Sequence, residues 1–478
     1  MLDTVLAPRP EIQRIFDLQK QHKYVVARTT ARERIAKLER LHAVLLRYRS
    51  DIQAALWADF RKSATEADLT ELGVINTEIR HTIRRLQSWM TPKQVSTPLA
   101  LFGTSSEIRY EPKGLSLILS PWNFPFNLTF VPIVSALAAG NCIIVKPSEY
   151  APASSALMKK IVEDCFPPEE VALLEGDASV AQELMTLPFN HVFFTGSPMI
   201  GKLVMAAAAK HLSSVTLELG GKSPVIVDET ADLDVAASKL VWTRMMNAGQ
   251  SCVSPDYILV HERVQDALLQ KIGEKIRQFY GNTPEAIQSG PDYCRLISDK
   301  HFARVTGLID EAVQRGAQVA FGGERDAATR YVAPTVLTHI PEEATIWNEE
   351  VFGPVLSVRP YRALEETVEY IDTKPTPLAL YIFSGSRRTI EYVLNHTRSG
   401  NTTVNDCELH FFNMELPFGG MNNSGIGKCH GEFGFHEFSN ARGICYQNRF
   451  WPITNFFHPP YGRSRLANWM LEGVLRWF

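Results

Sequence analysis

The feature that most constrains the fold is an alternation of short apolar runs with segments of helical length, from Gly114 to Lys210. The apolar runs end at glycine, proline or polar residues, which is typical of buried strands. Strands that alternate with helices form parallel sheets covered by helices, and such sheets bind ligands beyond the carboxyl ends of their strands. We expect strands at 115–119, 142–147, 171–176 and 191–196, and helices at 127–139, 154–165, 179–187 and 199–210.

The chain on either side of this stretch shows other patterns. From Glu11 to Met90, apolar residues recur at helical spacing, which predicts covering helices. Leu99–Tyr110 reads as an extended excursion or hairpin arm, and Gly400–Asn405 also reads as extended. A second α/β pattern follows Cys252, so the sequence predicts a second sheet. Its expected strands are 257–261, 318–321, 333–337, 355–358 and 378–384, and its expected helices are 265–279, 302–315 and 365–372.

Length and composition limit the classes of function. A chain of 478 residues is long enough for two or three domains. Its formal net charge of −3 gives no electrostatic argument for binding nucleic acid. The seven cysteines are scattered and form no CxxC pair, which predicts reduced thiols and a cytoplasmic protein. We expect no secretory signal and no membrane span, because neither a signal pattern nor a long apolar run occurs.

The stretch from Thr216 to Pro255 contains two side chains suited to covalent catalysis. Glu218 follows an apolar, strand-like run, and Cys252 lies in Gly-Gln-Ser-Cys after a helix-like run. A thiol can form a covalent intermediate, and a carboxylate can activate the water that releases it. A cysteine considered alone is more often a small buried apolar residue than a nucleophile, so both interpretations of Cys252 stay open here.

Two short motifs suggest a nucleotide, each with a plainer alternative. FTGSPMIGKL (194–203) has Leu203 where a P-loop needs serine or threonine, and Pro198 lacks an N–H for phosphate. The turn either presents a helix N-terminus to a pyrophosphate or is a structural turn. Lys146 and Glu149, at the end of a strand, either hold a ribose diol or are two surface charges.

The only group that resembles a metal site lies near the C-terminus. Cys429, His430 and Glu432 are followed by His436 and Glu437, but their spacing matches neither a zinc ribbon nor H-E-x-x-H. We interpret this segment as a structural loop and expect no metal.

Taken together, these motifs resemble the aldehyde dehydrogenase superfamily. They occur in the family's order and spacing from Leu115 to Pro354, and LPFGGMNNSGIGKCHGEFGFHEFS (416–439) extends the match. The short N-terminus and this C-terminal block are similar to the class 3 branch, and ADFRKSATE (58–66) is similar to bacterial fatty-aldehyde dehydrogenases. The motifs are Pro121-Trp-Asn-Phe-Pro125, Lys146-Pro-Ser-Glu149, Phe194-Thr-Gly-Ser197 with Gly201, Glu218-Leu-Gly-Gly221, Gly249-Gln-Ser-Cys252 and Glu350-Val-Phe-Gly-Pro354.

The resemblance implies a role for each matching residue. Cys252 would attack the aldehyde carbonyl, Asn123 would donate its side-chain amide to the oxyanion, and Glu218 would act as general base on water. NAD is the implied cofactor, with NADP accepted by many class 3 relatives. Its implied binding residues are Lys146 and Glu149 at the adenine ribose, Gly196, Ser197 and Gly201 at the pyrophosphate, Glu350 and Phe352 at the nicotinamide ribose, and Leu219.

The resemblance also implies an α/β fold with three parts. These are a Rossmann-like parallel-sheet cofactor domain, a second α/β catalytic domain and a small extended oligomerisation arm. It further implies a homodimer. The expected divisions are 1–216 for NAD(P) binding with an arm at about 99–112, 217–399 for catalysis, 400–446 for oligomerisation and an active-site loop, and 447–478 as a tail.

The substrate and the tail carry open alternatives. Phe411 and Phe412 lie in an apolar loop, and with Trp122 they are candidates to line the substrate channel. Medium-to-long-chain aliphatic aldehydes are the expected substrates; aromatic aldehydes, or transfer of the acyl group to coenzyme A, are the alternatives. The aromatic and basic tail from Phe450 either packs over a subunit, or lines the substrate entrance and contacts a membrane surface.

Overall fold

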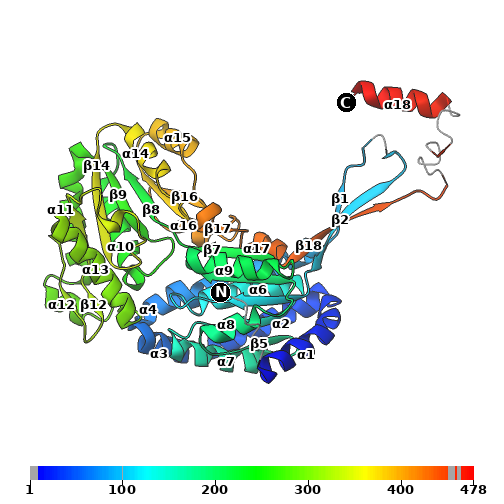
Figure 1. The fold of residues 1–478 in the computed structure, drawn as a ribbon, viewed down its shortest axis with the longest axis horizontal. Helices are drawn as coiled ribbons and strands as arrows, with labels where there is room; N and C mark the ends of the chain where they lie inside the picture. Colours follow the sequence, from blue (N-terminus) through cyan, green and yellow to red (C-terminus); the bar gives the residue numbers. More distant parts are fainter. Residues whose placement is uncertain (1–8, 99–100, 451–457, 460–464, 478) are drawn as a thin grey trace.

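The computed structural model describes every residue except 1–8, 99–100, 451–457, 460–464 and 478. The described chain forms two large sheets, each covered by helices, and an arm that projects from the body (Figure 1). The expected α/β class with parallel sheets is confirmed.

The first sheet has six strands in the order β17-β7-β6-β3-β4-β5. All its neighbours pair in parallel except β17, which runs antiparallel to β7. The predicted run HVFFTG is a strand along its whole length, and the other three predicted runs of this sheet also form strands. The strands are β3 (Leu115–Leu119), β4 (Cys142–Lys146), β5 (Val171–Leu173), β6 (His191–Gly196), β7 (Ser214–Leu219) and β17 (Gly425–Ile426).

Helices cover this sheet. Five of them, α1 to α5, precede the first strand in the chain, and α6 to α9 alternate with the strands. α6 ends at Gly140, whose φ of 87° is the left-handed conformation that glycine adopts most readily at helix ends. A π-helix, Asp68–Leu72, interrupts the helical region before α5. The helices are α1 (Pro10–Ala27), α2 (Ala31–Arg47), α3 (Arg49–Phe60), α4 (Ala64–Ala67), α5 (Gly73–Met90), α6 (Asn127–Ala139), α7 (Pro152–Cys165), α8 (Ala178–Leu184) and α9 (Pro198–Ala209).

The second sheet has seven strands in the order β10-β13-β14-β9-β8-β15-β16, parallel except at the β10 edge. The predicted extended segment 400–405 forms the other edge strand, β16, which pairs with β15. The strands are β8 (Ser223–Val227), β9 (Pro255–His261), β10 (Gln318–Phe321), β13 (Thr335–Thr338), β14 (Val355–Tyr361), β15 (Ala379–Phe383) and β16 (Asn401–Val404). Its helices are α10 (Leu233–Met245), α11 (Gln265–Tyr280), α12 (Pro284–Ser289), α13 (Asp299–Arg315), α14 (Leu364–Asp372) and α15 (Arg387–His396); the short β11 (Arg325–Asp326) and β12 (Tyr331–Val332) form a separate hairpin.

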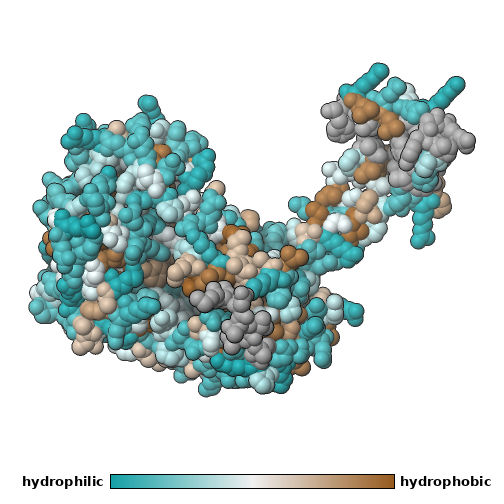
Figure 2. Space-filling view, viewed as in Figure 1, coloured by the Kyte–Doolittle hydropathy of each residue, from teal (hydrophilic) through white to brown (hydrophobic). Residues whose placement is uncertain are grey.

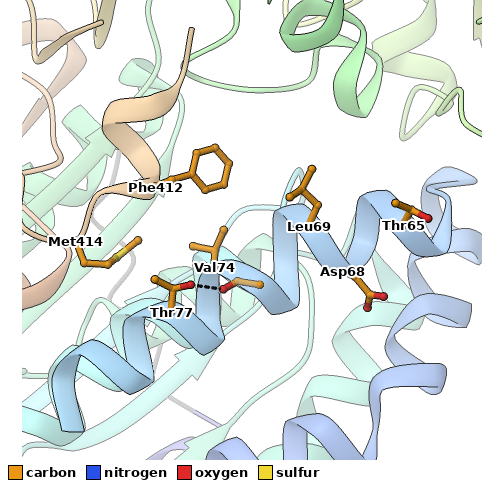
Figure 3. Close-up of a pocket in the computed structure, with 8 residues that line it drawn as sticks. Thr65, Asp68, Leu69, Val74, Thr77, Phe412 and Met414 are labelled. Atoms are coloured by element: carbon orange, nitrogen blue, oxygen red, sulfur yellow. Dashed lines mark hydrogen bonds between the residues drawn. The ribbon is translucent and has the colours of Figure 1, made fainter. Parts of the chain in front are cut away.

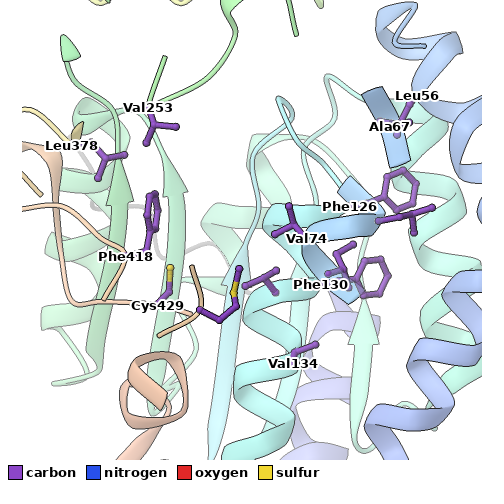
Figure 4. Packing of buried hydrophobic residues seen from close by; sticks show 14 of the residues in the cluster. Leu56, Ala67, Val74, Phe126, Phe130, Val134, Val253, Leu378, Phe418 and Cys429 are labelled. Atoms are coloured by element: carbon purple, nitrogen blue, oxygen red, sulfur yellow. The ribbon is translucent and has the colours of Figure 1, made fainter. Parts of the chain in front are cut away.

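One apolar core connects the two halves. The same cluster of buried side chains includes Val134 of α6, Val253 next to Cys252, and Phe418 and Cys429 of the C-terminal segment (Figure 4). Burying one such large apolar side chain contributes about 1.5–3 kcal/mol. This shared core fixes the ends of the first sheet's strands relative to those of the second.

The arm is a three-stranded antiparallel sheet, in the order β1-β2-β18. β1 (Lys93–Val95) and β2 (Ser105–Pro112) are consecutive in the chain, whereas β18 (Ser439–Tyr446) returns from the C-terminal part. The predicted arm segment 99–112 thus contains β2, and residues 99–100 lie outside the described chain.

Beyond the arm, the tail contains α18 (Arg465–Trp477), which Figure 1 shows near the tip of the arm and away from both large sheets. Trp469 and Leu475 are largely exposed on it. Among the described helices, none combines the length and apolar character needed to cross a bilayer. Of the aromatic residues that characterise the tail sequence, Trp451, Phe456, Phe457, Tyr461 and Phe478 lie outside the described residues.

Candidate active site

Cys252 lies in a loop between α10 and β9 that is held almost entirely by buried hydrogen bonds. Gln250 is fully buried; its side chain donates to the carbonyls of Asn247 (2.9 Å) and Arg295 (3.1 Å) and accepts from the N–H of Ile297 (3.0 Å). The Cys252 residue itself is only half-buried, so the loop presents it at the edge of the core.

The loop begins with a turn that has unusual backbone geometry. Asn247 and Ala248 have φ values of 51° and 52°, in the left-handed region that few residues other than glycine adopt. The Asn247 side chain donates to the carbonyls of Asn123 (2.8 Å) and Gln250 (3.1 Å), so it ties the turn to the loop that precedes α6. Asparagine tolerates this conformation better than most residues and here also supplies both bonds.

Asn123, in the loop before α6, contacts the loop that carries Cys252. It is buried, and its side-chain amide donates to the Gln250 carbonyl at 3.1 Å. That bond directs the amide toward the segment that carries Cys252 and leaves the second N–H of the amide for another acceptor. The structure therefore places Asn123, the predicted oxyanion donor, in direct contact with the loop that carries Cys252.

Glu218 occupies the carboxyl end of β7, as its position in the sequence indicates. It is buried, and neither carboxylate oxygen has a hydrogen-bond partner among the described residues. Burial raises its pKa to about 8, against the opposing effects of the nearby Cys429 thiol and Lys428 ammonium. A carboxyl group of this pKa can accept and release a proton near neutral pH.

The thiol of Cys252 is surrounded by acidic groups. Burial raises the pKa of Cys252 well above its ordinary value, and the carboxylates of Glu350, Glu218 and Glu408 raise it further. Burial of the sulfur and these carboxylates therefore favour the protonated thiol over the thiolate.

A network of charges shapes the Glu350 loop. Arg304 donates to the carbonyls of Glu350 (3.1 Å) and Val351 (2.6 Å), and Asp256 accepts from the Val351 N–H at 2.9 Å. Burial raises the pKa of Glu350 to about 8. Its Oε1 is buried without a partner in the described chain, which suits an acceptor for a ribose hydroxyl. Phe352, with φ of 46°, directs its ring against Trp122, with ring centroids 5.4 Å apart.

The remaining predicted cofactor residues lie at the carboxyl ends of the strands of the first sheet. Lys146 ends β4 and pairs with Glu149 at 2.7 Å, so the structure brings together the two charges assigned to the adenine ribose. Gly196 ends β6. Ser197 caps the N-terminus of α9, where its hydroxyl accepts the N–H of Ile200. This arrangement leaves a helix N-terminus available to an anionic group.

Close packing explains the glycine in the first turn of α9. A Cβ on Gly201 would lie 2.7 Å from Leu219 Cδ2, so the glycine lets α9 approach the end of β7. Leu219, at the end of the strand that carries Glu218, thus packs against the first turn of α9. The strand ends, capped helix and unpartnered Glu350 oxygen together fit a dinucleotide.

An apolar pocket of about 440 Å³ lies between the N-terminal helices and the C-terminal segment (Figure 3). Phe412 and Met414 face Leu69 and Val74 across it, while Asp68 points to the other side of its helix. Asp68 is engaged there by the guanidinium of Arg49. The pocket is therefore lined by apolar groups, two threonines and one charged residue, Asp68, which is paired with Arg49.

The other two predicted channel residues do not line this pocket. Phe411 packs between Phe418 and His430, with ring centroids 5.0 and 4.9 Å away. Trp122 contacts His301 and Phe352. His430, a member of the metal-like segment of the sequence, is buried in this aromatic packing. The described residues contain no group of three or more histidine, cysteine or acidic side chains that could hold a metal ion.

Sequence reasoning missed several residues of this region. Leu69, Val74 and Met414 line the apolar pocket. Glu408 is a further buried acid near Cys252; it has a φ of 61° and a pKa that burial raises to about 8. A glutamate next to the predicted channel loop was the available signal for Glu408, whereas Leu69 and Val74 showed only the ordinary helical pattern and Met414 lies in a segment predicted as loop.

The comparisons with known proteins agree with this geometry. The profile described as "Aldehyde dehydrogenase family" matches residues 4–444. The chain is 41% identical over 426 residues to the 4,4′-diaponeurosporen-aldehyde dehydrogenase of Staphylococcus aureus, covering 89% of this chain and 91% of that protein. It is 40% identical over 450 residues to mouse aldehyde dehydrogenase family 3 member B1, covering 94% of each.

Solved structures give the same result. The substrate-bound AldH of Staphylococcus aureus matches with a TM-score of 0.88 and 40% identity, covering 91% of this chain and 94% of that one. The NAD⁺ complex of an aldehyde dehydrogenase from Bacillus cereus matches with a TM-score of 0.84 and 27% identity, covering 92% of this chain and 89% of that one.

Proposed function

The chain belongs to the aldehyde dehydrogenase family, and we propose that it oxidises medium-to-long-chain aliphatic aldehydes to carboxylic acids with Cys252 as nucleophile. Oxidation of aldehydes to acids follows from family membership. The substrate class, the residue roles and the cofactor preference are our proposals.

The observation that carries the substrate class is the apolar pocket beside Phe412. Ligand pockets that are mainly hydrophobic bind apolar chains, with a few polar groups to fix orientation. The one charged residue among the lining side chains, Asp68, is already paired with Arg49. An alkyl chain would gain about 0.8 kcal/mol for each CH₂ group that it buries there. A substrate with a charged far end would find no complementary group.

The first chemical step needs a fixed nucleophile and a fixed oxyanion donor. In our proposal, the Cys252 thiol first loses its proton to solvent water, and the resulting thiolate attacks the aldehyde carbon. The carbonyl electron pair moves onto the oxygen, which becomes negative and accepts hydrogen bonds from the Asn123 amide and the Cys252 N–H. The buried loop of Gln250 and Asn247 holds both groups before the substrate arrives, which is the condition for electrostatic catalysis. NAD(P)⁺, when bound, supplies the hydride acceptor for this tetrahedral adduct.

The second step is hydrolysis of the thioester on Cys252. Glu218 would take a proton from water, the resulting hydroxide would attack the thioester carbon, and the Cys252 sulfur would leave as thiolate. The unpartnered carboxylate oxygens of Glu218 are available to hold that water. Coenzyme A in place of water is the alternative; comparing products with and without coenzyme A separates the two.

The cofactor proposal follows from the strand ends. Glu350 would hold the nicotinamide ribose, Phe352 would pack beside it, and Lys146 with Glu149 would hold the adenine ribose. The Glu149 carboxylate would repel a 2′-phosphate, so NAD is preferred over NADP.

The proposed divisions of the chain do not coincide with the two sheets: the boundary after residue 216 lies within β7 of the first sheet, and β16 of the second sheet belongs to the third division. Residues 1–216 bind the cofactor, residues 217–399 form the catalytic domain, and residues 400–446 supply the active-site loop and part of the oligomerisation surface. The arm joins two copies as a homodimer. The tail after Arg449 contacts a membrane surface or the substrate entrance, which the exposed Trp469 and Leu475 support. A chain that ends at Arg449 and keeps both liposome binding and long-chain KM would refute the tail's role.

The decisive experiment measures kcat/KM for aldehydes from propanal to dodecanal, with benzaldehyde and a charged semialdehyde. We expect kcat/KM to rise with chain length and to be lowest for the charged substrate. Leu69→Asp should lower kcat/KM for dodecanal about tenfold and leave propanal nearly unchanged. Leu46→Asp, at an equally exposed leucine of α2, is the matched control. A maximum at benzaldehyde would replace the aliphatic assignment with an aromatic one.

A further inference from the structure

A charged cluster, in which Lys62 and Glu71 are buried and Glu66 is half-buried, joins the N-terminal helices to the two loops that carry Asn123 and Cys252. It consists of Lys62, just before α4, Glu66 in α4 and Glu71 in the π-helix. Lys62 and Glu71 are fully buried, and the Lys62 ammonium donates to Glu71 Oε1 at 3.0 Å. None of the three takes part in the steps proposed above.

Glu66 supports the nucleophile loop. Its Oε1 accepts the backbone N–H of Asn247 at 2.8 Å. Asn247 is the left-handed residue whose side chain holds the carbonyls of Asn123 and Gln250. A residue other than glycine keeps such a conformation only where its surroundings fix it. The Glu66 carboxylate is therefore an anchor of the turn that connects the two loops.

Glu71 supports the loop of Asn123 from the same cluster. Its Oε2 accepts the N–H of Asn127 at 2.8 Å, and the Asn127 side chain donates to the Thr70 carbonyl at 3.1 Å. The Lys62 ammonium lies 4.4 Å from the ring centroid of Phe124, next to Asn123. Buried charges lose their hydration, and contacts of this kind are what offset that loss.

We propose that Glu66 is a positioning residue, which sets the distance between the Asn123 amide and the Cys252 loop through its bond to Asn247. The inference rests on the proposed roles of Asn123 and Cys252. It also gives a physical reason for a glutamate at position 66, far from both residues in the sequence and with no contact to the reacting atoms.

The test compares Glu66→Leu, which removes the acceptor, with Glu66→Gln, which keeps an acceptor oxygen. The readout is the rate constant of the first NADH burst per active site, with the burst amplitude counting the active sites. We expect the burst rate of E66L to fall about 10- to 100-fold, because displacement of about 1 Å has effects of that size. The rate of E66Q should stay within about fivefold of wild type, and the dissociation constant of NAD should stay within about twofold in both variants.

Asp59→Asn is the matched control. Asp59 is a buried carboxylate that also accepts backbone N–H groups, those of Ala153 (3.1 Å) and Ser154 (2.8 Å), but at the start of α7. We expect D59N to lower Tm without changing the burst rate per active site. If E66L behaves as D59N does, with a lower Tm and an unchanged burst rate per site, Glu66 is purely structural and the inference is wrong.

A second readout separates this inference from the proposed function. Iodoacetamide alkylation of Cys252, followed by mass spectrometry of its peptide, needs no aldehyde. We expect E66L to change the alkylation rate constant at least threefold, while E66Q and D59N leave it unchanged. If wild type gives no burst but E66L alters alkylation in this way, the proposed function fails and the positioning role stands. An unaltered alkylation rate together with an unaltered burst rate overturns the positioning role alone.

Discussion

The loop that carries Cys252 and the strand end that carries Glu218 serve two steps of one proposed reaction, yet the structure holds them in opposite ways. Around Cys252, Asn247 and Gln250 bond to backbone groups on three segments. Glu218, by contrast, is buried with no hydrogen-bond partner for either oxygen among the described residues.

The difference fits what each step requires. Oxyanion stabilisation depends on donors that are in place before charge develops, so rigidity favours the first step. A general base must bind water, take its proton and later release it, and so needs acceptor oxygens that no other group occupies. In the proposed reaction, the fixed loop around Cys252 would serve bond formation, and the unpartnered Glu218 carboxylate would serve proton transfer.

Removal of the proposed nucleophile, Cys252, should stop both chemical steps and has the largest expected effect. Cys252→Ala should abolish both the NADH burst and steady-state turnover, a loss on the order of 10⁵-fold or more. NAD binding, measured by fluorescence titration, should persist because the cofactor residues remain. Turnover of C252A at the wild-type rate would exclude a covalent mechanism.

Replacement of the base should affect only the unpartnered side. In Glu218→Gln, the first burst of NADH should remain while steady-state turnover falls by about 10²–10⁴-fold, because the acyl-enzyme forms but hydrolyses slowly. Rapid-mixing absorbance and mass spectrometry of the trapped thioester measure the two steps. If the burst and the steady state fell equally, Glu218 would act before acylation.

Removal of the oxyanion donor should affect the fixed side. Asn123→Ala should lower the burst rate by about 10²–10³-fold, the usual cost of losing one such donor. Asn141→Ala is the control: Asn141 is equally buried and bonds to the Ala136 and Phe438 carbonyls, away from the site. N141A should lower Tm with an unchanged burst rate per active site, and an equal loss of rate in both variants would contradict the assignment.

The pH dependence of thioester hydrolysis tests the proposed role of Glu218 without any substitution. Because burial raises the pKa of Glu218 to about 8, its base form is lost as pH falls, and the hydrolysis rate should drop about tenfold per pH unit below pH 8. The folded state also holds this proton more tightly than the unfolded state does. Its contribution therefore lowers the free energy of unfolding as pH rises from 4.5 to about 8. A pH-independent hydrolysis rate over this range would show that another group is the base.

The sequence predicts both sheets because most of their strands have a clear local pattern, although β8 (Ser223–Val227) and β17 (Gly425–Ile426) are not among the strands that it predicts. Runs such as HVFFTG are continuous and apolar, and turn residues bound them. The same argument places Glu218, Gly196 and Lys146 at strand ends, since the carboxyl ends of parallel strands share one edge.

The Glu66 cluster and the arm pairing could not be predicted in this way. The bond from Glu66 to Asn247 joins residues 181 positions apart, and β18 pairs with a β2 partner more than 300 positions away. SNARGICY, the sequence of β18, has no apolar alternation to indicate a strand. The hydrogen bonds of the π-helix span five residues where those of an α-helix span four, and the apolar spacing of Asp68–Leu72 does not reveal this difference.

The smallest expected effect concerns a residue outside both sides of the comparison, Glu149. Glu149→Gln should raise kcat/KM for NADP about fivefold relative to NAD, because a charge pair near 4 Å in water is worth about 1 kcal/mol. Glu163→Gln is the matched control, since Glu163 also pairs with a lysine, Lys159 at 3.3 Å, on the exposed surface of α7. If E149Q left the ratio of kcat/KM for NADP to kcat/KM for NAD unchanged, as E163Q should, then Glu149 would not discriminate at the 2′-position of the adenine ribose.

The burst rate with NAD should be the same in both variants, because neither the loop of Cys252 nor Glu218 contacts the pair of Lys146 and Glu149. A slower burst in E149Q alone would mean that binding at the adenine end of the cofactor affects the fixed loop around Cys252.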